Sequence, residues 1–187
     1  MKEIIQDSQA LIYDKGLVTI VEIMGRNAGW LVGAAALSKG EDCDGPDLIY
    51  VPELPFDIDN FLVRIKELLA EKTFVVVAVS EGIRLADGRY VCELTDGVDF
   101  VDAFGHKQIK GTANYLARRL AQELGCKTRT IELSSMQRAA SHLASRIDIL
   151  EDFQDGGLAV KAADEGDTGE MVIIKRHYDD PYQSTTD

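Results

Sequence analysis

The junction between a strand and a helix near the start of the chain most limits how the chain can fold. Residues 17–24 read Leu-Val-Thr-Ile-Val-Glu-Ile-Met, an apolar and largely β-branched run that stops at Gly25 and Arg26. A run of small residues with helical character follows as far as Ser38. A buried strand that turns at once into a helix is typical of a parallel sheet covered by helices. The sequence therefore predicts an α/β fold whose chemistry lies at the carboxyl edge of the sheet.

Apolar strand patterns alternate with helical patterns along the rest of the chain. We expect further strands at 47–52, 73–79, 129–133 and 171–175, and helices at 27–38, 57–72, 108–124, 139–147 and 149–163, the last weakened at Gly156-Gly157. The dipeptide Asp87-Gly88 predicts a small surface hairpin, while residues 1–15 and 178–187 are expected to be a polar lead-in and an exposed end. The order predicts one Rossmann-like, three-layer domain over residues 1–187, a parallel sheet with a small hairpin insertion.

Charge and composition exclude several classes of function. The 187 residues carry a net charge of −12, which argues against a general nucleic-acid or anionic-membrane binder because such proteins need a positive field. No apolar run approaches the roughly 20 residues that span a bilayer, and the N-terminus lacks a signal-peptide core. A cytoplasmic location is therefore expected. Cys43, Cys92 and Cys126 form no Cys-x-x-Cys pair, so reduced thiols are expected and no metal site is predicted in this chain.

Three predicted strands end in residues that can recognise a polar ligand. These ends are 24–26 (Met-Gly-Arg), 80–82 (Ser-Glu-Gly) and 134–138 (Ser-Ser-Met-Gln-Arg). Because the carboxyl ends of parallel strands share one edge, two arginines and a carboxylate would meet there, a set that suits a sugar phosphate. The structural alternatives are a tight turn at Gly25, a turn cap at Glu81 and ordinary surface charges at the arginines.

These motifs together resemble the 6-phosphofructokinase family. Residues 21–30, Val-Glu-Ile-Met-Gly-Arg-Asn-Ala-Gly-Trp, resemble its Met-Gly-Arg substrate signature. Residues 80–83, 102–108 (Asp-Ala-Phe-Gly-His-Lys-Gln) and 136–138 (Met-Gln-Arg) follow in the order and spacing of the family's second half. The Ala-Gly-Trp ending and the Phe-Gly-His-Lys-Gln segment look most like the pyrophosphate-dependent branch. The resemblance covers about residues 10–176.

The resemblance implies a role for individual residues. Contacts to fructose 6-phosphate are implied for Met24, Gly25, Arg26, Glu81, Arg129, Ser135 and Arg138. Arg26 would also lie near the transferring phosphoryl group as the catalytic residue, and Glu81 would hold sugar hydroxyls. Arg138, and more weakly Arg129, would bind the 6-phosphate, and in this family one arginine of that set can come from a neighbouring subunit, so a homo-oligomer is expected. Ser135 stands where the family has Tyr or His, so one phosphate donor is weakened or replaced.

Two segments of the family pattern are missing from the sequence. Neither the Gly-Gly-Asp-Gly type phosphate-donor loop nor the Thr-x-Asp-x-Asp catalytic segment occurs in it, and both belong to a preceding half of the subunit. The resemblance therefore implies a substrate-binding portion lacking the N-terminal donor-binding half, an excised domain or truncated product. In the intact glycolytic enzyme a phosphoryl group would pass from pyrophosphate or ATP to the 1-hydroxyl of fructose 6-phosphate, giving fructose 1,6-bisphosphate, with Mg²⁺ held outside this chain.

The isolated chain is expected to be inactive, because phosphoryl transfer depends on positioning and charge stabilisation by both halves of the site. Two alternatives stay open at this point. One is a non-catalytic sugar-phosphate-binding or regulatory module. The other is an unrelated nucleotide-binding α/β domain, which is disfavoured because no Gly-x-Gly-x-x-Gly or Walker loop follows a strand.

Overall fold

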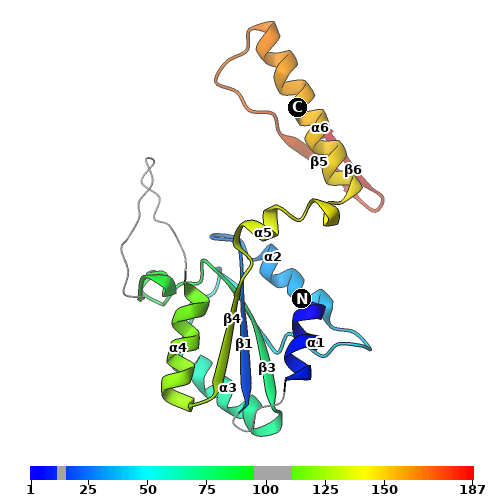
Figure 1. The fold of residues 1–187 in the computed structure, drawn as a ribbon. Coiled ribbons are helices and arrows are strands. Elements are labelled where there is room, and N and C mark those ends of the chain that lie inside the picture. Colours follow the sequence, from blue (N-terminus) through cyan, green and yellow to red (C-terminus); the bar gives the residue numbers. More distant parts are fainter. Residues whose placement is uncertain (12–15, 95–110) are drawn as a thin grey trace. The chain divides into compact units, whose positions relative to one another are not determined.

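The computed structural model describes residues 1–11, 16–94 and 111–187. It divides the chain into two compact units, Met1–Gln137 and Arg138–Asp187. The first unit holds a four-stranded sheet in the order β2-β3-β1-β4, with every neighbouring pair parallel (Figure 1). The parallel sheet and its helices confirm the predicted α/β, Rossmann-like class. The expectation of one domain over residues 1–187 stays a prediction.

The two central strands, β1 (Leu17–Ile23) and β3 (Phe74–Ser80), are buried almost throughout. Their β-branched side chains fill both faces of the sheet, which is the pattern of central parallel strands. Leu17 pairs with Phe74 and Ile23 pairs with Ser80, so both strands end at the same level. The edge strands β2 (Leu48–Tyr50) and β4 (Lys127–Glu132) are shorter and less buried. The register therefore brings the carboxyl ends of β1 and β3 directly side by side.

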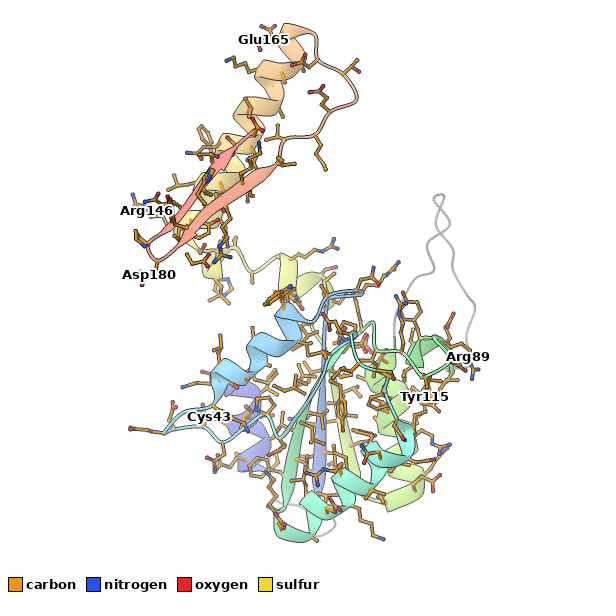
Figure 2. The ribbon with its side chains drawn as sticks, turned by 180° about the vertical axis from the view of Figure 1, so that it is seen from behind. Cys43, Arg89, Tyr115, Arg146, Glu165 and Asp180 are labelled. Carbon is orange, nitrogen blue, oxygen red and sulfur yellow. The ribbon has the colours of Figure 1, made fainter. Side chains whose placement is uncertain are left out.

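Helices cover both faces of this sheet. They are α1 (Lys2–Ala10), α2 (Trp30–Gly33), the 3₁₀ helix η1 (Ala34–Ser38), α3 (Ile58–Glu71), the 3₁₀ helix η2 (Val91–Leu94) and α4 (Thr112–Leu124). One face of β1 presents Val21 and Ile23 to α1 and α2, and the other presents Val18 and Ile20 to α3 and α4. This alternation is the period of two of a strand. Figure 2 shows Cys43 and Tyr115 on opposite sides of the sheet.

Two predicted boundaries in the N-terminal part are wrong. Residues 1–11 are not a polar lead-in, because α1 packs Ile5, which is 3% exposed, against the sheet; residues 12–15 of that prediction lie outside the described residues. The helix predicted at 27–38 begins at Trp30, with Gly29 as its N-cap residue. The Gly29 amide donates a hydrogen bond to the Glu53 carboxylate at 2.6 Å. The helix then tightens into η1. A short run of small residues has too little local preference to fix either end.

The next elements follow the sequence prediction closely. Asp57 caps α3 by accepting a hydrogen bond from the Asn60 amide at 3.0 Å, and α4 ends at Gly125 in the left-handed conformation. The predicted hairpin around Asp87-Gly88 exists as a narrow turn with a single antiparallel bridge between Arg84 and Tyr90. Residues 108–110, where the helix at 108–124 was expected to begin, lie outside the described residues.

The C-terminal part differs most from the prediction. It contains α5 (Ser134–Arg138), whose last residue begins the second unit, the 3₁₀ helix η3 (Ser141–Leu143), α6 (Arg146–Glu165), β5 (Ile174–Asp179) and β6 (Tyr182–Thr186). The helix predicted at 139–147 is replaced by η3 and the start of α6. Helix α6 runs without interruption through Gly156-Gly157. Of the last predicted strand, 171–175, only residues from Ile174 onward are strand, as the start of β5. Strand β5 pairs antiparallel with β6, which is formed from the expected exposed end, instead of joining the parallel sheet.

A buried carboxylate explains why that end is ordered. Glu151 of α6 accepts hydrogen bonds from the Tyr182 hydroxyl and the Ser184 hydroxyl, each at 2.5 Å. These contacts hold the pKa of Glu151 below its usual range, because both hydroxyls stabilise the ionised form. Residues distant in sequence thus fix β6 on α6, and no local pattern in 178–187 encodes them.

Candidate functional site

The loops after β1 and β3 are joined by hydrogen bonds at the carboxyl edge of the sheet. The Gly25 amide donates to the Glu81 carboxylate at 3.2 Å, and the Ser80 hydroxyl donates to the Gly25 carbonyl at 2.7 Å. Gly25 has a φ of 144°, a conformation open to glycine and costly for other residues. The structure therefore brings Gly25, and with it the Met-Gly-Arg segment, against Glu81.

A very close backbone approach sets the path of Arg26. A β-carbon at Gly82 would lie 1.9 Å from the Arg26 carbonyl oxygen and 2.5 Å from its carbonyl carbon. Such distances exclude any side chain at Gly82. The glycine of the Ser-Glu-Gly segment is therefore required by the neighbouring loop, a reason that the sequence alone did not supply.

The end of β4 reaches the same edge through a residue that sequence reasoning left without a role. The Gln137 side-chain oxygen accepts a hydrogen bond from the Met24 amide at 3.0 Å. The Leu133 amide donates to the Glu22 carbonyl at 3.2 Å, which continues the strand pairing to the start of α5. Ser134, the first residue of α5, has a φ of 44°, a left-handed conformation that carries strain outside glycine. In the sequence, the position of Gln137 inside the Met-Gln-Arg motif was the feature that could have indicated this role.

The remaining predicted site residues are Ser135, Arg138 and Arg129, and they lie in different parts of the structure. Ser135 is exposed on α5, the helix that also carries Gln137. Arg138 begins the second unit, so its assignment to the site stays a prediction. Arg129 pairs in register with Thr19, five residues before Met24 and about 16 Å along the strand from it. Its guanidinium forms an ion pair with Asp7 of α1, so within one chain Arg129 does not join the edge.

Glu22 is a buried carboxylate close to the site that sequence reasoning did not assign. It is 6% exposed and accepts a hydrogen bond from the Ala113 amide at 2.8 Å, at the start of α4. Burial raises the pKa of Glu22 to about 7, with a smaller contribution from the negative charges of Glu132 and Glu81. The neighbouring Thr112 hydroxyl donates to the Glu81 carbonyl at 3.0 Å. The start of α4 is thus hydrogen-bonded to the ends of β1 and β3. In the sequence, a single carboxylate inside an apolar strand was the feature that could have identified Glu22.

Metal clusters, cysteine thiols and membrane-spanning helices are the other features that bear on function. Over residues 1–11, 16–94 and 111–187, no three His, Cys, Asp or Glu side chains are placed to hold a metal ion. The three cysteines are buried and their thiols are reduced. None of the helices in these ranges is both long and apolar enough to cross a membrane. Residues 102–108, with His106, lie outside them.

Comparison with known proteins identifies the family to which these loops belong. A sequence model described as Phosphofructokinase matches residues 1–162. The chain belongs to the phosphofructokinase family. This match confirms the resemblance drawn from the motifs, and it excludes an unrelated nucleotide-binding domain.

Individual relatives agree with that membership. A pyrophosphate–fructose 6-phosphate 1-phosphotransferase of Halomonas elongata is 38% identical over 170 residues, 91% of this chain and 40% of the relative. An ATP-dependent 6-phosphofructokinase 2 of Streptomyces coelicolor is 31% identical over 159 residues, 84% of this chain and 43% of the relative. The crystal structure of a pyrophosphate-dependent phosphofructokinase from Marinobacter aquaeolei matches with a TM-score of 0.73 and 28% identity, over 100% of this chain and 42% of that one.

This chain spans about two fifths of the length of these relatives. Of the two relatives compared by sequence, the pyrophosphate-dependent one shares the higher identity, in agreement with the predicted branch.

Proposed function

We propose that this chain is the fructose 6-phosphate-binding portion of a phosphofructokinase. The observation that supports this most directly is the bonding of the Met-Gly-Arg loop to Glu81 at the carboxyl edge of the sheet, in a chain of this family. Ligands of open parallel sheets bind at that edge. The proposed reaction of the intact enzyme is phosphoryl transfer from pyrophosphate, with ATP as the alternative donor, to the 1-hydroxyl of the sugar phosphate.

Glu81 is the proposed acceptor for the sugar hydroxyls. One of its carboxylate oxygens accepts a hydrogen bond from the Gly25 amide at 3.2 Å. No described residue donates to the other oxygen, which leaves it for a ligand. Hydroxyl groups that donate to an ionised carboxylate form stronger bonds than they do to a neutral acceptor.

Arg26 and Arg138 are the proposed phosphate ligands. Arg26 follows the glycine whose backbone is fixed by Ser80 and Glu81, so its guanidinium is carried by a rigid loop. A fixed cation near the transferring phosphoryl group stabilises developing negative charge without reorganisation. Ser135 comes from the helix that Gln137 ties to Met24. We assign Ser135 to the 6-phosphate on that ground, and Arg138 on the family resemblance of the Met-Gln-Arg motif.

Arg129 fits this proposal only through a second copy of the chain. Its ion pair with Asp7 lies away from the edge that carries Glu81. We therefore assign Arg129 to the site of a neighbouring subunit in a homo-oligomer. Such an assignment makes Arg129 irrelevant to ligand binding by a monomer.

The donor and the metal belong to the other half of the proposed enzyme. The described residues of this chain do not fit a magnesium ion, since no three metal-binding side chains converge. Mg²⁺ would be held by carboxylates of a donor-binding half and would neutralise charge on the phosphates. A cytoplasmic and glycolytic role belongs to the same proposal.

Calorimetric titration with fructose 6-phosphate tests the proposal. We expect the 187-residue chain to bind fructose 6-phosphate, and Arg138→Ala to weaken binding by about tenfold through the loss of a charge-assisted contact. Arg146→Ala is the matched control, because it removes another exposed arginine near the start of the second unit and should leave the affinity unchanged. Absence of fructose 6-phosphate binding by the unaltered chain contradicts the proposal.

A non-catalytic sugar-phosphate-binding or regulatory module is the second candidate, favoured by the absence of a Thr-x-Asp-x-Asp segment from the 187 residues. Turnover separates the two. The chain alone should produce no measurable fructose 1,6-bisphosphate. Addition of a polypeptide that carries the glycine-rich loop and the aspartate segment should restore turnover if the chain is part of an enzyme, and should not if it is a module. Robust turnover by the chain alone would contradict both.

A further inference from the structure

A second arginine lies beside the Met-Gly-Arg loop and has no role in the function proposed above. The Arg84 Nη2 donates to the Asn27 side-chain oxygen at 2.8 Å and to the Tyr90 hydroxyl at 2.6 Å. Its guanidinium carbon also lies 4.4 Å from the centroid of the Tyr90 ring. Arg84 is half-buried, so a stacked ring and two hydrogen bonds on one nitrogen hold the cation in place.

The charge of Arg84 meets no acidic partner among the residues that the structure describes. No carboxylate of a described residue forms an ion pair with Arg84, whereas Arg64 pairs with Glu67 at 2.6 Å and Arg89 pairs with Asp87 at 2.7 Å. The chain carries twelve more acids than bases, yet the contacts that hold the Arg84 guanidinium are two hydrogen bonds and one aromatic ring. Its Nη1 and Nε donate to none of the described residues.

The position of Arg84 connects it to the site. The backbone of Gly82 abuts that of Arg26, and two residues later Arg84 bonds to Asn27, the residue after Arg26. Arg26 and Arg84 are therefore carried by two loops in direct contact at the carboxyl edge of the sheet. Guanidinium groups bind phosphate through a planar fork of donors, and stacking on an aromatic ring lowers the entropy lost on binding.

We propose that Arg84 is a further phosphate-binding arginine of this site, in addition to Arg26 and Arg138, and that Tyr90 and Asn27 hold it in position. The identity of the ligand rests on the proposed function, and the phosphate is either that of the sugar or that of the phosphoryl donor. Whichever of the two phosphates it is, the Arg84 guanidinium donates hydrogen bonds to its oxygens, in addition to those donated by Arg26.

Binding of two probes, fructose 6-phosphate and inorganic pyrophosphate, tests this inference by calorimetry at low and high salt. Arg84→Gln should weaken at least one of them by about tenfold, with a smaller loss at high salt because the interaction is screened. Arg84→Lys should recover part of the affinity. The probe that is weakened identifies the phosphate that Arg84 meets. Arg89→Gln is the matched control, because it removes the same charge from the same turn, where Arg89 is exposed and already paired with Asp87 (Figure 2).

The outcomes separate this inference from the proposed function. If Arg84→Gln binds both probes as tightly as the unaltered chain, the inference is overturned while the proposed function stands. If the unaltered chain binds pyrophosphate and not fructose 6-phosphate, the proposed function fails and the pyrophosphate titration still tests Arg84. If the chain binds neither, both fail. Equal losses in Asn27→Ala and Arg84→Gln, without a salt dependence, would show that Arg84 only positions the loop and would overturn the inference.

Discussion

Gly82→Ala should be the most damaging single-methyl change near the site. The added carbon would lie 1.9 Å from the carbonyl oxygen, 2.5 Å from the carbonyl carbon and 2.7 Å from the α-carbon of Arg26. All three are backbone atoms, so no side-chain rotation can relieve the overlap. Either the β1–α2 loop or the segment after β3 must move by more than 1 Å.

The cost follows from what that movement breaks. Overpacking in a tight core typically costs 1–3 kcal/mol, and here the loops are also joined by the Ser80–Gly25 and Gly25–Glu81 hydrogen bonds. Each hydrogen bond contributes about 1 kcal/mol. We therefore expect a loss of about 3–5 kcal/mol in the free energy of unfolding of the first unit.

Amide hydrogen exchange in β1 and β3 measures this loss in the first unit alone. Gly33→Ala is the matched control, because Gly33 has helical angles and no atom within 4 Å of a new β-carbon. That variant should be stabilised by about 0.5–1 kcal/mol through reduced backbone entropy of the unfolded chain. A Gly82→Ala chain as stable as the Gly33→Ala chain would refute the close approach of the two loops.

Two further predictions concern charged residues near the sheet. The pKa of Glu22 is raised from 4.5 to about 7 on folding, so the folded chain binds more protons than the unfolded one and Glu22 makes stability fall as pH rises from 4.5 to 7. Chemical unfolding at pH 5 and pH 8 should show a decline that is smaller by about 2.5 kcal/mol in Glu22→Gln, and an equal decline in both chains would contradict the raised pKa of Glu22. Arg129→Ala removes an exposed ion pair with Asp7 and should cost less than about 1 kcal/mol of stability. Its affinity for fructose 6-phosphate should equal that of the unaltered chain while the protein is monomeric in analytical ultracentrifugation, and a loss in the monomer would refute the assignment of Arg129 to a neighbouring subunit.

Much of the fold could be predicted because its signals are local. Apolar β-branched runs predicted β1 and β3 within one residue at each end, since a buried central strand needs such side chains on both faces. The helix expected at 57–72 matches α3 within one residue at each end, and the end expected at residue 124 matches the end of α4. Local patterns failed for α1, a short polar helix, and for β6, whose order comes from contacts with Glu151.

The candidate site likewise has features that the sequence predicted and features that only the structure showed. The sequence alone determined which residue types follow each strand, and the parallel order of the strands implied that Gly25 and Glu81 would share an edge. Only the tertiary structure decided that Gln137 and Glu22 belong beside them and that Gly82 must be a glycine. It also showed that Arg129 pairs with Thr19, some distance along the strand from the carboxyl edge of the sheet. The physical reason is that a local pattern encodes the period and the ends of an element, whereas strand register and the packing of loops depend on contacts between residues far apart in the chain.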